Sequence, residues 1–366
     1  MHQVAHHHSN ATTRRTRLGW TLTLITTAAT ITLFRRAALP SPIMLGSMIG
    51  ALCGAILAQT RIRPPRFTIG PSQGIVALMA AGPLVTTPLH QLASYALPTT
   101  LAIGITLLLC AACAWIITQT SSVDSSTAVM STLAGGASAM AVLSEELGAD
   151  FRYVTVVQYL RVMIVSFSLP FLLPLLIGEH VNAGTQPLVD LSPHSAINWL
   201  VVIAVITIPG WLASFTTLPA PRLLAPLAVA ILIGEWQPAL VANPGIVETA
   251  AFLIIGWQAG GACDRQSLVT NARRLPIAFF CIVVLMAGCG ILAGILTALH
   301  FGTFTDTYLA TTPGGLYIVL AIANDQESGP IVTVMQVTRM VVMVIVTAFV
   351  PRLIRAQQHH KDSAQY

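Results

Sequence analysis

The sequence has 366 residues, of which 55% are hydrophobic and only 8% are Asp, Glu, Lys or Arg. A soluble globular protein carries roughly 25% of such charged residues, so 18 basic and 13 acidic side chains are too few to cover a soluble surface. The apolar content excludes a disordered chain, and the scattered basic residues argue against nucleic-acid binding despite the net charge of +5. The composition therefore predicts an all-α integral membrane protein, whose partner is the lipid bilayer.

Ten apolar runs are long enough to cross about 30 Å of hydrocarbon. They start near Leu18, Ile43, Phe67, Pro98, Tyr153, Ile197, Leu223, Gly245, Pro276 and Pro330. Two further runs, Thr127 to Leu147 and Asp306 to Ala323, are each interrupted by a pair of glycines. The chain has ten spans if these two segments return to the side they entered, and twelve if they cross.

The distribution of Lys and Arg favours ten spans, because short cytoplasmic loops are enriched in these residues. With twelve spans and a cytoplasmic N-terminus, nine basic residues lie inside and seven outside. With ten spans, fourteen lie inside and two, Arg35 and Arg36, lie outside, while Arg161 and Arg339 fall within spans. We therefore predict a multi-pass protein of the plasma (inner) membrane with cytoplasmic N- and C-termini. The one explanation for the position of Arg35 and Arg36 is that their side chains extend to the membrane interface.

Short motifs recur in the same order in the two halves of the chain. Leu39-Pro40-Ser41-Pro42 matches Leu218-Pro219-Ala220-Pro221, 179 residues later, and the segment 132–136 matches 311–315 at the same offset. Gln158-Tyr159-Leu160-Arg161 matches Gln336-Val337-Thr338-Arg339 at an offset of 178. These matches predict a duplication with repeats at 18–180 and 197–355 and cytoplasmic tails at 1–17 and 356–366. Each repeat has about five transmembrane helices plus one Gly-Gly-interrupted segment, broken or re-entrant, so an odd number of spans gives the repeats inverted topology.

The glycine pairs are expected to break their helices. Glycine costs about 1 kcal/mol in a helix interior and Pro313 removes a backbone donor. The freed backbone groups must lie against protein or line a watery cavity, as in many secondary transporters. The alternative is that each pair is a close helix-packing site. The predicted substrate-binding residues are Gly135, Gly136, Gln158, Arg161, Pro313, Gly314, Gly315, Gln336 and Arg339.

Gln158 and Arg161 are three residues apart and share a helix face, as do Gln336 and Arg339. A guanidinium within an apolar run is costly unless it is paired or in water, and its planar fork suits a carboxylate or phosphate. We predict that the arginines bind an anionic solute or pair with acids; the alternative is that each extends to the nearby interface. Asp150 and Asp325 are candidate coupling residues, and Asp306 is a candidate helix cap.

No enzyme constellation is present in the sequence, so no catalytic residue, metal site or cofactor is expected. His90, His180, His194 and His300 stand singly at span ends, without the spacing of a catalytic metal site, and the tract His6 to His8 is too short to indicate one. Walker, dinucleotide-binding and nucleophile-elbow motifs are absent from the sequence. Cys110 and Cys113 have the spacing of a redox or metal pair, but within an apolar run they are expected to be small packing residues.

The motif set resembles the AbrB membrane-protein family, which also carries a label of ammonia monooxygenase. The residues that carry the resemblance are Gly135-Gly136, Gly148-Ala149-Asp150, Gln158 to Arg161, Thr311 to Gly315 and Gln336 to Arg339. The sequence departs from the family pattern at Ala134, where proline is usual, and at Ala139 and Ile318, where the family often has glutamate. These two positions weaken any coupling role for an acid at the break.

The resemblance implies, by analogy with inverted-repeat transporters, a secondary transporter or permease for a small solute. The alternative is a membrane-bound regulator of gene expression that senses a small molecule. The longest cytoplasmic connection, Cys263 to Leu275, is short for a partner surface and favours transport. The absence of an intramembrane histidine cluster argues against a monooxygenase. Assembly into a homo-oligomer stays open.

Overall fold

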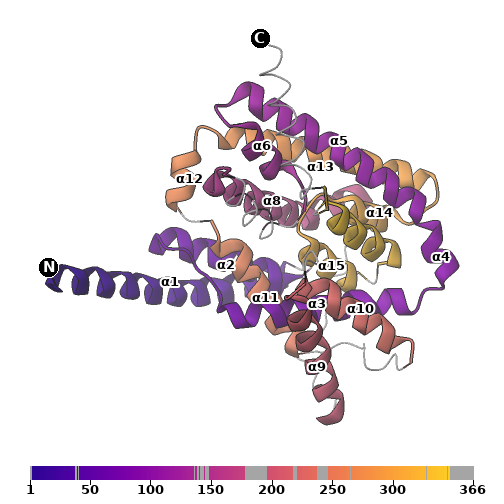
Figure 1. Ribbon diagram of the computed structural model, residues 1–366, viewed down its shortest axis with the longest axis horizontal. Helices are drawn as coiled ribbons and strands as arrows, with labels where there is room; N and C mark the ends of the chain where they lie inside the picture. The colour runs from indigo at the N-terminus through magenta and orange to yellow at the C-terminus, as the bar shows by residue number, and fades with distance from the viewer. Residues whose placement is uncertain are drawn as a thin grey trace. The chain divides into compact units, whose positions relative to one another are not determined.

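The structure is a computed structural model in which most of the chain is described. The backbone is described for residues 2–177, 196–216, 221–236 and 246–346, except residues 38, 40, 136, 138, 139, 141–143, 145–147, 264, 327 and 344. Every regular element in these ranges is a helix (Figure 1). This agrees with the predicted all-α class.

The described chain forms two compact units, and each unit combines segments from both halves of the sequence. Unit 1 is built from residues 1–87, 166–270 and 317–328, and unit 2 from residues 88–165, 271–316 and those from 329 onward. Unit 1 contains α1 (His2–Arg36), α2 (Pro42–Ala58), α3 (Arg66–Val85), α9 (Ala196–Ala213), α10 (Pro221–Gly234), α11 (Ile246–Gly261) and most of α12 (Arg265–Asn271) and α15 (Leu316–Asp325). Unit 2 contains α4 (Leu89–Ser94), α5 (Ala96–Thr120), α6 (Ser125–Thr132), α13 (Leu275–Ala298), α14 (Phe304–Thr311) and the helix Pro330–Met343, while α8 (Phe151–Ile177) contributes to both units.

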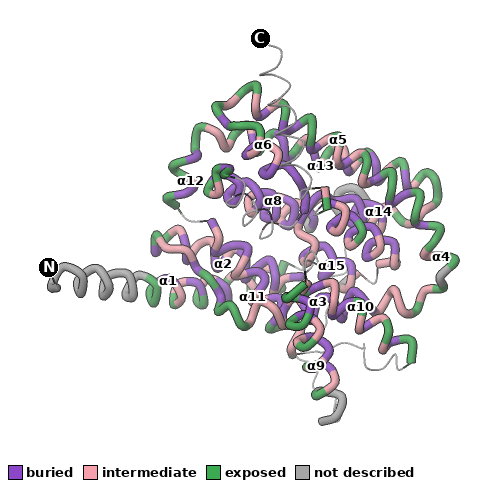
Figure 2. Tube along the Cα trace, in the orientation of Figure 1, coloured by how far each residue is buried: buried purple, intermediate pink, exposed green. Residues whose placement is uncertain are grey.

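Three described helices are long and apolar enough to cross a membrane: Arg66–Val85, His90–Thr120 and Leu275–Ala298. Shorter apolar helices are Pro42–Ala58, Leu200–Ala213, Pro221–Gly234 and Pro330–Met343. Exposed and buried residues alternate along α5 (Figure 2), and its exposed side chains include Leu108 at 72% and Trp115 at 65%. Such large exposed apolar side chains are expected where a helix meets lipid. The helical architecture is therefore that of a membrane-associated protein, while the number of spans and their orientation stay predictions.

Helix boundaries recur at the spacing found in the sequence. α6 and α14 correspond at both ends, since Ser125 precedes Phe304 and Thr132 precedes Thr311 by 179 residues. The starts of α2 and α10, at Pro42 and Pro221, and of α5 and α13, at Ala96 and Leu275, are also 179 residues apart. The two halves of the chain therefore place helices at equivalent positions.

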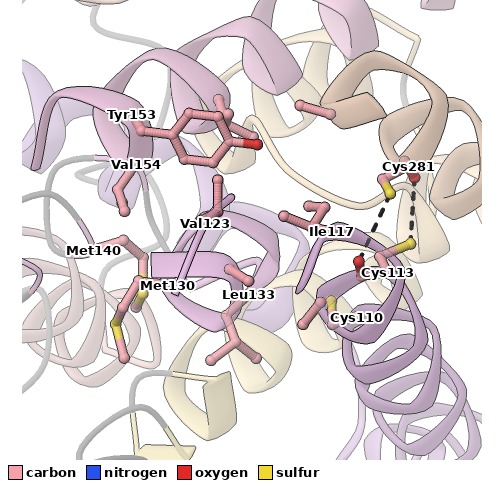
Figure 3. Packing of buried hydrophobic residues seen from close by; sticks show 14 of the residues in the cluster. Cys110, Cys113, Ile117, Val123, Met130, Leu133, Met140, Tyr153, Val154 and Cys281 are labelled. Atoms are coloured by element: carbon pink, nitrogen blue, oxygen red, sulfur yellow. Dashed lines mark hydrogen bonds between the residues drawn. The ribbon is translucent and has the colours of Figure 1, made fainter. Parts of the chain in front are cut away.

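The corresponding helices α5 and α13 pack against each other in opposite directions. Thr106 Oγ1 lies 4.0 Å from Cys289 Sγ, and further along α5 the Cys113 thiol donates to the Cys281 carbonyl at 3.6 Å. Residue numbers thus rise along α5 as they fall along α13. Figure 3 shows Cys113 and Cys281 facing each other, with the reciprocal contact from the Cys281 thiol to the Cys113 carbonyl at 3.8 Å.

The core of unit 2 lies where α5, α6, α8 and α13 meet (Figure 3). Tyr153, Met130 and Met140 are fully or almost fully buried there. Cys110 and Cys113 are also buried in this core and carry free thiols. The prediction that these two cysteines act as small packing residues is confirmed.

In unit 1, glycines allow α2 and α11 to approach closely. A Cβ added at Gly260 would overlap the carbonyl oxygen of Met48, and one added at Gly256 would overlap Ser47 Oγ. The helices therefore touch through backbone atoms at these positions, which is the small-residue packing common in membrane helices.

Replacing Gly260 with leucine is expected to destabilise unit 1 by about 3 kcal/mol, because the backbone of Met48 cannot move aside as a flexible side chain could. The measurement is thermal unfolding of the purified protein in detergent. Gly104→Leu is the matched control, since a Cβ at Gly104 has no neighbour within 4 Å. Equal unfolding temperatures for the two variants would contradict the close contact.

Candidate functional site

The second Gly-Gly segment is interrupted, as predicted. α14 ends at Thr311, and Thr312 has φ −53° and ψ 126°, which leaves the helix. Gly314 and Gly315 then have φ values of 123° and 67°, which glycine adopts without steric cost. α15 begins at Leu316, so two helices are separated by a short non-helical turn.

The first Gly-Gly segment leaves its helix at the equivalent residue. α6 ends at Thr132, and Leu133 has φ −60° and ψ 129°. Gly135 is buried, and a Cβ added there would lie 3.4 Å from Met343 Cβ, so this break packs on the helix Pro330–Met343. Gly136 lies outside the described residues.

In the first copy, a glutamine and an arginine of α8 hold the end of α6. Gln158 Nε2 donates to the carbonyls of Met130 and Leu133 at 2.7 and 2.9 Å. Arg161 Nη1 donates to the Thr132 carbonyl at 3.0 Å, and its Nη2 donates to Gln158 Oε1 at 2.6 Å. These contacts satisfy carbonyls that lack partners at the end of a helix.

The second copy repeats every one of these contacts. Gln336 Nε2 donates to the carbonyls of Leu309 and Thr312 at 2.6 and 3.3 Å. Arg339 Nη1 donates to the Thr311 carbonyl at 3.0 Å, and its Nη2 donates to Gln336 Oε1 at 2.6 Å. Both copies therefore build the same helix cap from side chains on a later helix, α8 in the first copy and Pro330–Met343 in the second.

The two guanidinium groups are buried inside unit 2. Arg161 is 2% exposed and Arg339 is 4% exposed, while both glutamines are fully buried. Each guanidinium group therefore contacts a helix end, while the alternative, extension to the membrane interface, stays a prediction. A positive charge at a helix C-terminus is favourable, because the helix dipole places partial negative charge there.

Each buried arginine also has an unused donor. The Nε atoms of Arg161 and Arg339 are buried without a hydrogen-bond partner in the described structure. A Cβ added at Gly314 would lie 2.9 Å from Arg161 Nε, so the second break lies against the arginine of the first copy. Since a buried donor without an acceptor is costly, these groups are the strongest candidates in unit 2 for contact with an anionic ligand.

The start of α6 is fixed by an aspartate and a threonine. Asp124 is the N-cap, and its carboxylate accepts from the backbone N–H and the hydroxyl of Thr127 at 3.1 and 2.5 Å. Thr127 Oγ1 in turn accepts the backbone N–H of Asp150 at 2.9 Å, which joins the start of α6 to the start of α8.

The start of α14 has the same arrangement with the two residue types exchanged. Thr303 is the N-cap and forms a capping box with Asp306, with 2.7 Å between the Thr303 hydroxyl and Asp306 Oδ2. Asp306 Oδ1 accepts the backbone N–H of Gly329 at 2.9 Å, as Thr127 accepts that of Asp150. Asp306 was predicted as a helix cap; the N-cap is Thr303, and Asp306 takes part as the N3 residue of the capping box.

The other predicted residues lie in different surroundings. Pro313 is buried and Gly315 is half-buried at the second break. Asp150 is exposed at the start of α8, where its Oδ1 accepts from Tyr153 N and its Oδ2 lies 3.7 Å from Arg274 Nη1. It therefore lies near the start of α6 and not at the break. The side chain of Asp325 lies outside the described residues.

The acceptors of the two arginines could not be identified from the sequence, because they are backbone carbonyls. The only sequence signal of these two sites is the spacing of glutamine and arginine on one helix face. Among the described side chains, no carboxylate forms an ion pair with Arg161 or Arg339. That the arginines bind an anionic solute or pair with acidic residues therefore stays a prediction.

This architecture defines a class of helical, membrane-associated proteins with two interrupted helices whose ends are held by buried arginines. The family model described as transition state regulatory protein AbrB matches residues 43–355. The chain therefore belongs to the AbrB family, as its motifs predicted.

Two relatives cover most of the chain. It is 30% identical over 318 residues to "Putative regulator AbrB" of Escherichia coli (strain K12), covering 86% of this chain and 90% of the relative. It is 22% identical over 346 residues to "Uncharacterized protein YhjN" of Bacillus subtilis (strain 168), covering 86% of this chain and 87% of the relative.

Exchanging the two capping residues within one copy should preserve stability. We expect Asp124→Thr alone to cost about 1 kcal/mol, since the cap loses its carboxylate. The double variant Asp124→Thr with Thr127→Asp recreates the arrangement of Thr303 and Asp306, and should recover the loss to within about 0.5 kcal/mol. Thermal unfolding in detergent measures both. A double variant less stable than Asp124→Thr would show that the two caps are not interchangeable.

Proposed function

We propose that this protein is a secondary transporter, or permease, for a small anionic solute. The observation that carries the proposal is the pair of buried arginines at the two helix breaks, each with an unpartnered Nε–H. A guanidinium donates in a planar fork that suits carboxylate and phosphate oxygens. No catalytic residue, cofactor or metal takes part in the proposed activity.

The proposal includes two inverted repeats. The antiparallel packing of the corresponding helices α5 and α13 supports inverted topology, since a duplication in the same direction would place corresponding helices parallel. The identical hydrogen bonds at the two breaks support a common origin. Inverted repeats with interrupted helices are the architecture in which rocking of one part against another gives alternating access.

At the second break, the donor for an anion comes from the first copy. Arg161 Nε approaches Gly314 from α8. Gly314 lies against Arg161 in this structure, so an anion can reach Nε only if the break moves. Solute binding would thereby be coupled to movement of the interrupted segment, as alternating access requires.

The alternative function is a membrane-bound regulator of gene expression that senses a small molecule. The support for it is the name of the Escherichia coli relative and the description of the family. The same arginine site could serve a sensor, which would bind the solute without moving it across the membrane.

The test is flux into vesicles that contain the purified protein, with a panel of small carboxylates, phosphate and sulfate. We expect Arg161→Lys to reduce flux of the transported anion by about tenfold, because lysine keeps the charge and loses the planar fork. Arg339→Lys should have a similar effect. Arg152→Lys is the matched control, since Arg152 is exposed on the same helix as Arg161.

Thermal unfolding of each variant separates loss of the site from loss of the fold. Unchanged flux in folded Arg161→Lys would contradict the role of the arginine. Binding of an anion without flux, together with capture of a partner by the wild-type protein, would favour the regulator.

A further inference from the structure

A cavity within unit 1 is bounded by α3, α9 and α10, which lie next to one another (Figure 1). Its volume is about 230 Å³, below the roughly 300–1,000 Å³ of sites that enclose a drug-sized molecule. It is lined by Arg66, Phe67, Gly70, Pro71, Ile206, Thr207, Gly210, Trp211 and Arg222. This size suits a small polar group, and the two arginines indicate its charge.

Both arginines stand at the positive ends of helices. Arg66 is the first residue of α3 and Arg222 is the second residue of α10, and neither helix has an acidic residue in its first turn. A positive side chain at a helix N-terminus is unfavourable, whereas an anion there is favourable. Both arginines are exposed, and among the described residues neither has an ion-pair partner. Two helix ends and two guanidinium groups therefore converge on one cavity without a counter-charge.

Glycines hold the Arg222 side chain in the cavity. A Cβ added at Gly70 would lie 3.2 Å from Arg222 Cδ and 3.5 Å from its Nε, and one added at Gly210 would lie 3.1 Å from Arg222 Cα. The stem of Arg222 thus packs in the space left by Gly70, while Gly210 lies against its backbone. A larger side chain at residue 70 would displace the guanidinium.

The rim of the cavity is apolar and exposed. Phe67 is 78% exposed and Trp211 is 61% exposed, and Trp211 is in edge-to-face contact with Phe215, which is 75% exposed. Aromatic side chains of this kind gather at the level of lipid headgroups, with their rings against the acyl chains. A soluble anion would contact the arginines alone, whereas a phospholipid would contact both the arginines and the aromatic rings.

We propose that this cavity binds the phosphate of an anionic phospholipid through Arg66 and Arg222. The lipid tails lie along Phe67 and Trp211. Basic pockets between membrane helices on the cytoplasmic side bind anionic headgroups, and the predicted topology places both arginines on that side. The site does not depend on the proposed transport activity, because all of its residues lie in unit 1 and none of them is at the helix breaks.

The test is retention of phosphatidylglycerol by the purified protein, measured by mass spectrometry after exchange into phosphatidylcholine nanodiscs. We expect the wild-type protein to retain phosphatidylglycerol and the double variant Arg66→Gln with Arg222→Gln to retain about tenfold less. The matched control is Arg17→Gln with Arg63→Gln, which removes the same charge from exposed positions of unit 1 outside the cavity. This control should retain the lipid as the wild type does.

Gly70→Leu provides a second variant that keeps both arginines. Its side chain would fill the cavity beside Arg222, and we expect a similar loss of lipid. Equal loss in the Arg17→Gln, Arg63→Gln control would overturn the proposal, since diffuse charge would then explain retention. Full retention by the Arg66, Arg222 double variant would also overturn it. A third contradicting result is inorganic phosphate stabilising the wild type in phosphatidylcholine nanodiscs as much as phosphatidylglycerol does.

Discussion

A helix that stops inside an apolar chain leaves carbonyl groups that lipid cannot satisfy, and the organisation of unit 2 depends on how these groups are paired. α6 and α14 end after eight residues each, and a glutamine–arginine pair on α8 or on the helix Pro330–Met343 supplies the missing donors. Because the donors come from another helix, the break is stable only while α6 and α8 stay packed. The hydrogen bonds to the carbonyls at the end of α6 and the packing of α6 against α8 therefore depend on each other.

Asp and Thr exchange places at the starts of α6 and α14. Asp124 with Thr127 and Thr303 with Asp306 form the same contacts with the opposite order of residue types. A search for identical residues does not find this pair. What is common to the two copies is one carboxylate and one hydroxyl at the start of each broken helix. The correspondence between the two halves is therefore clearer in the geometry than in the residue identities.

Much of the fold could be predicted from apolar runs and from the glycine pairs, because both act locally on the backbone. The shared face of Gln158 and Arg161 could also be predicted, since three residues nearly complete a helical turn. The direction of the Arg161 side chain could not, because burial and extension to the interface are equally consistent with its position in the run. Its acceptor is the carbonyl of Thr132, and a carbonyl has no sequence signature. The cavity beside Arg222 could not be predicted either, because Arg66 and Arg222 are far apart in the chain and no motif connects them.

The buried arginines of unit 2 and the arginines beside the cavity of unit 1 have different electrostatic surroundings. Arg161 and Arg339 are buried and engaged with helix ends, so removing either would expose unsatisfied carbonyls as well as delete a charge. Arg66 and Arg222 stand at helix N-termini, where the dipole opposes a positive charge and a bound anion would offset it. An arginine that stabilises a helix end and an arginine that requires a counter-charge have opposite electrostatic contexts. It follows that lipid bound in unit 1 would stabilise the protein through charges already in place, whereas solute bound at Arg161 Nε in unit 2 would displace Gly314, which lies against that atom.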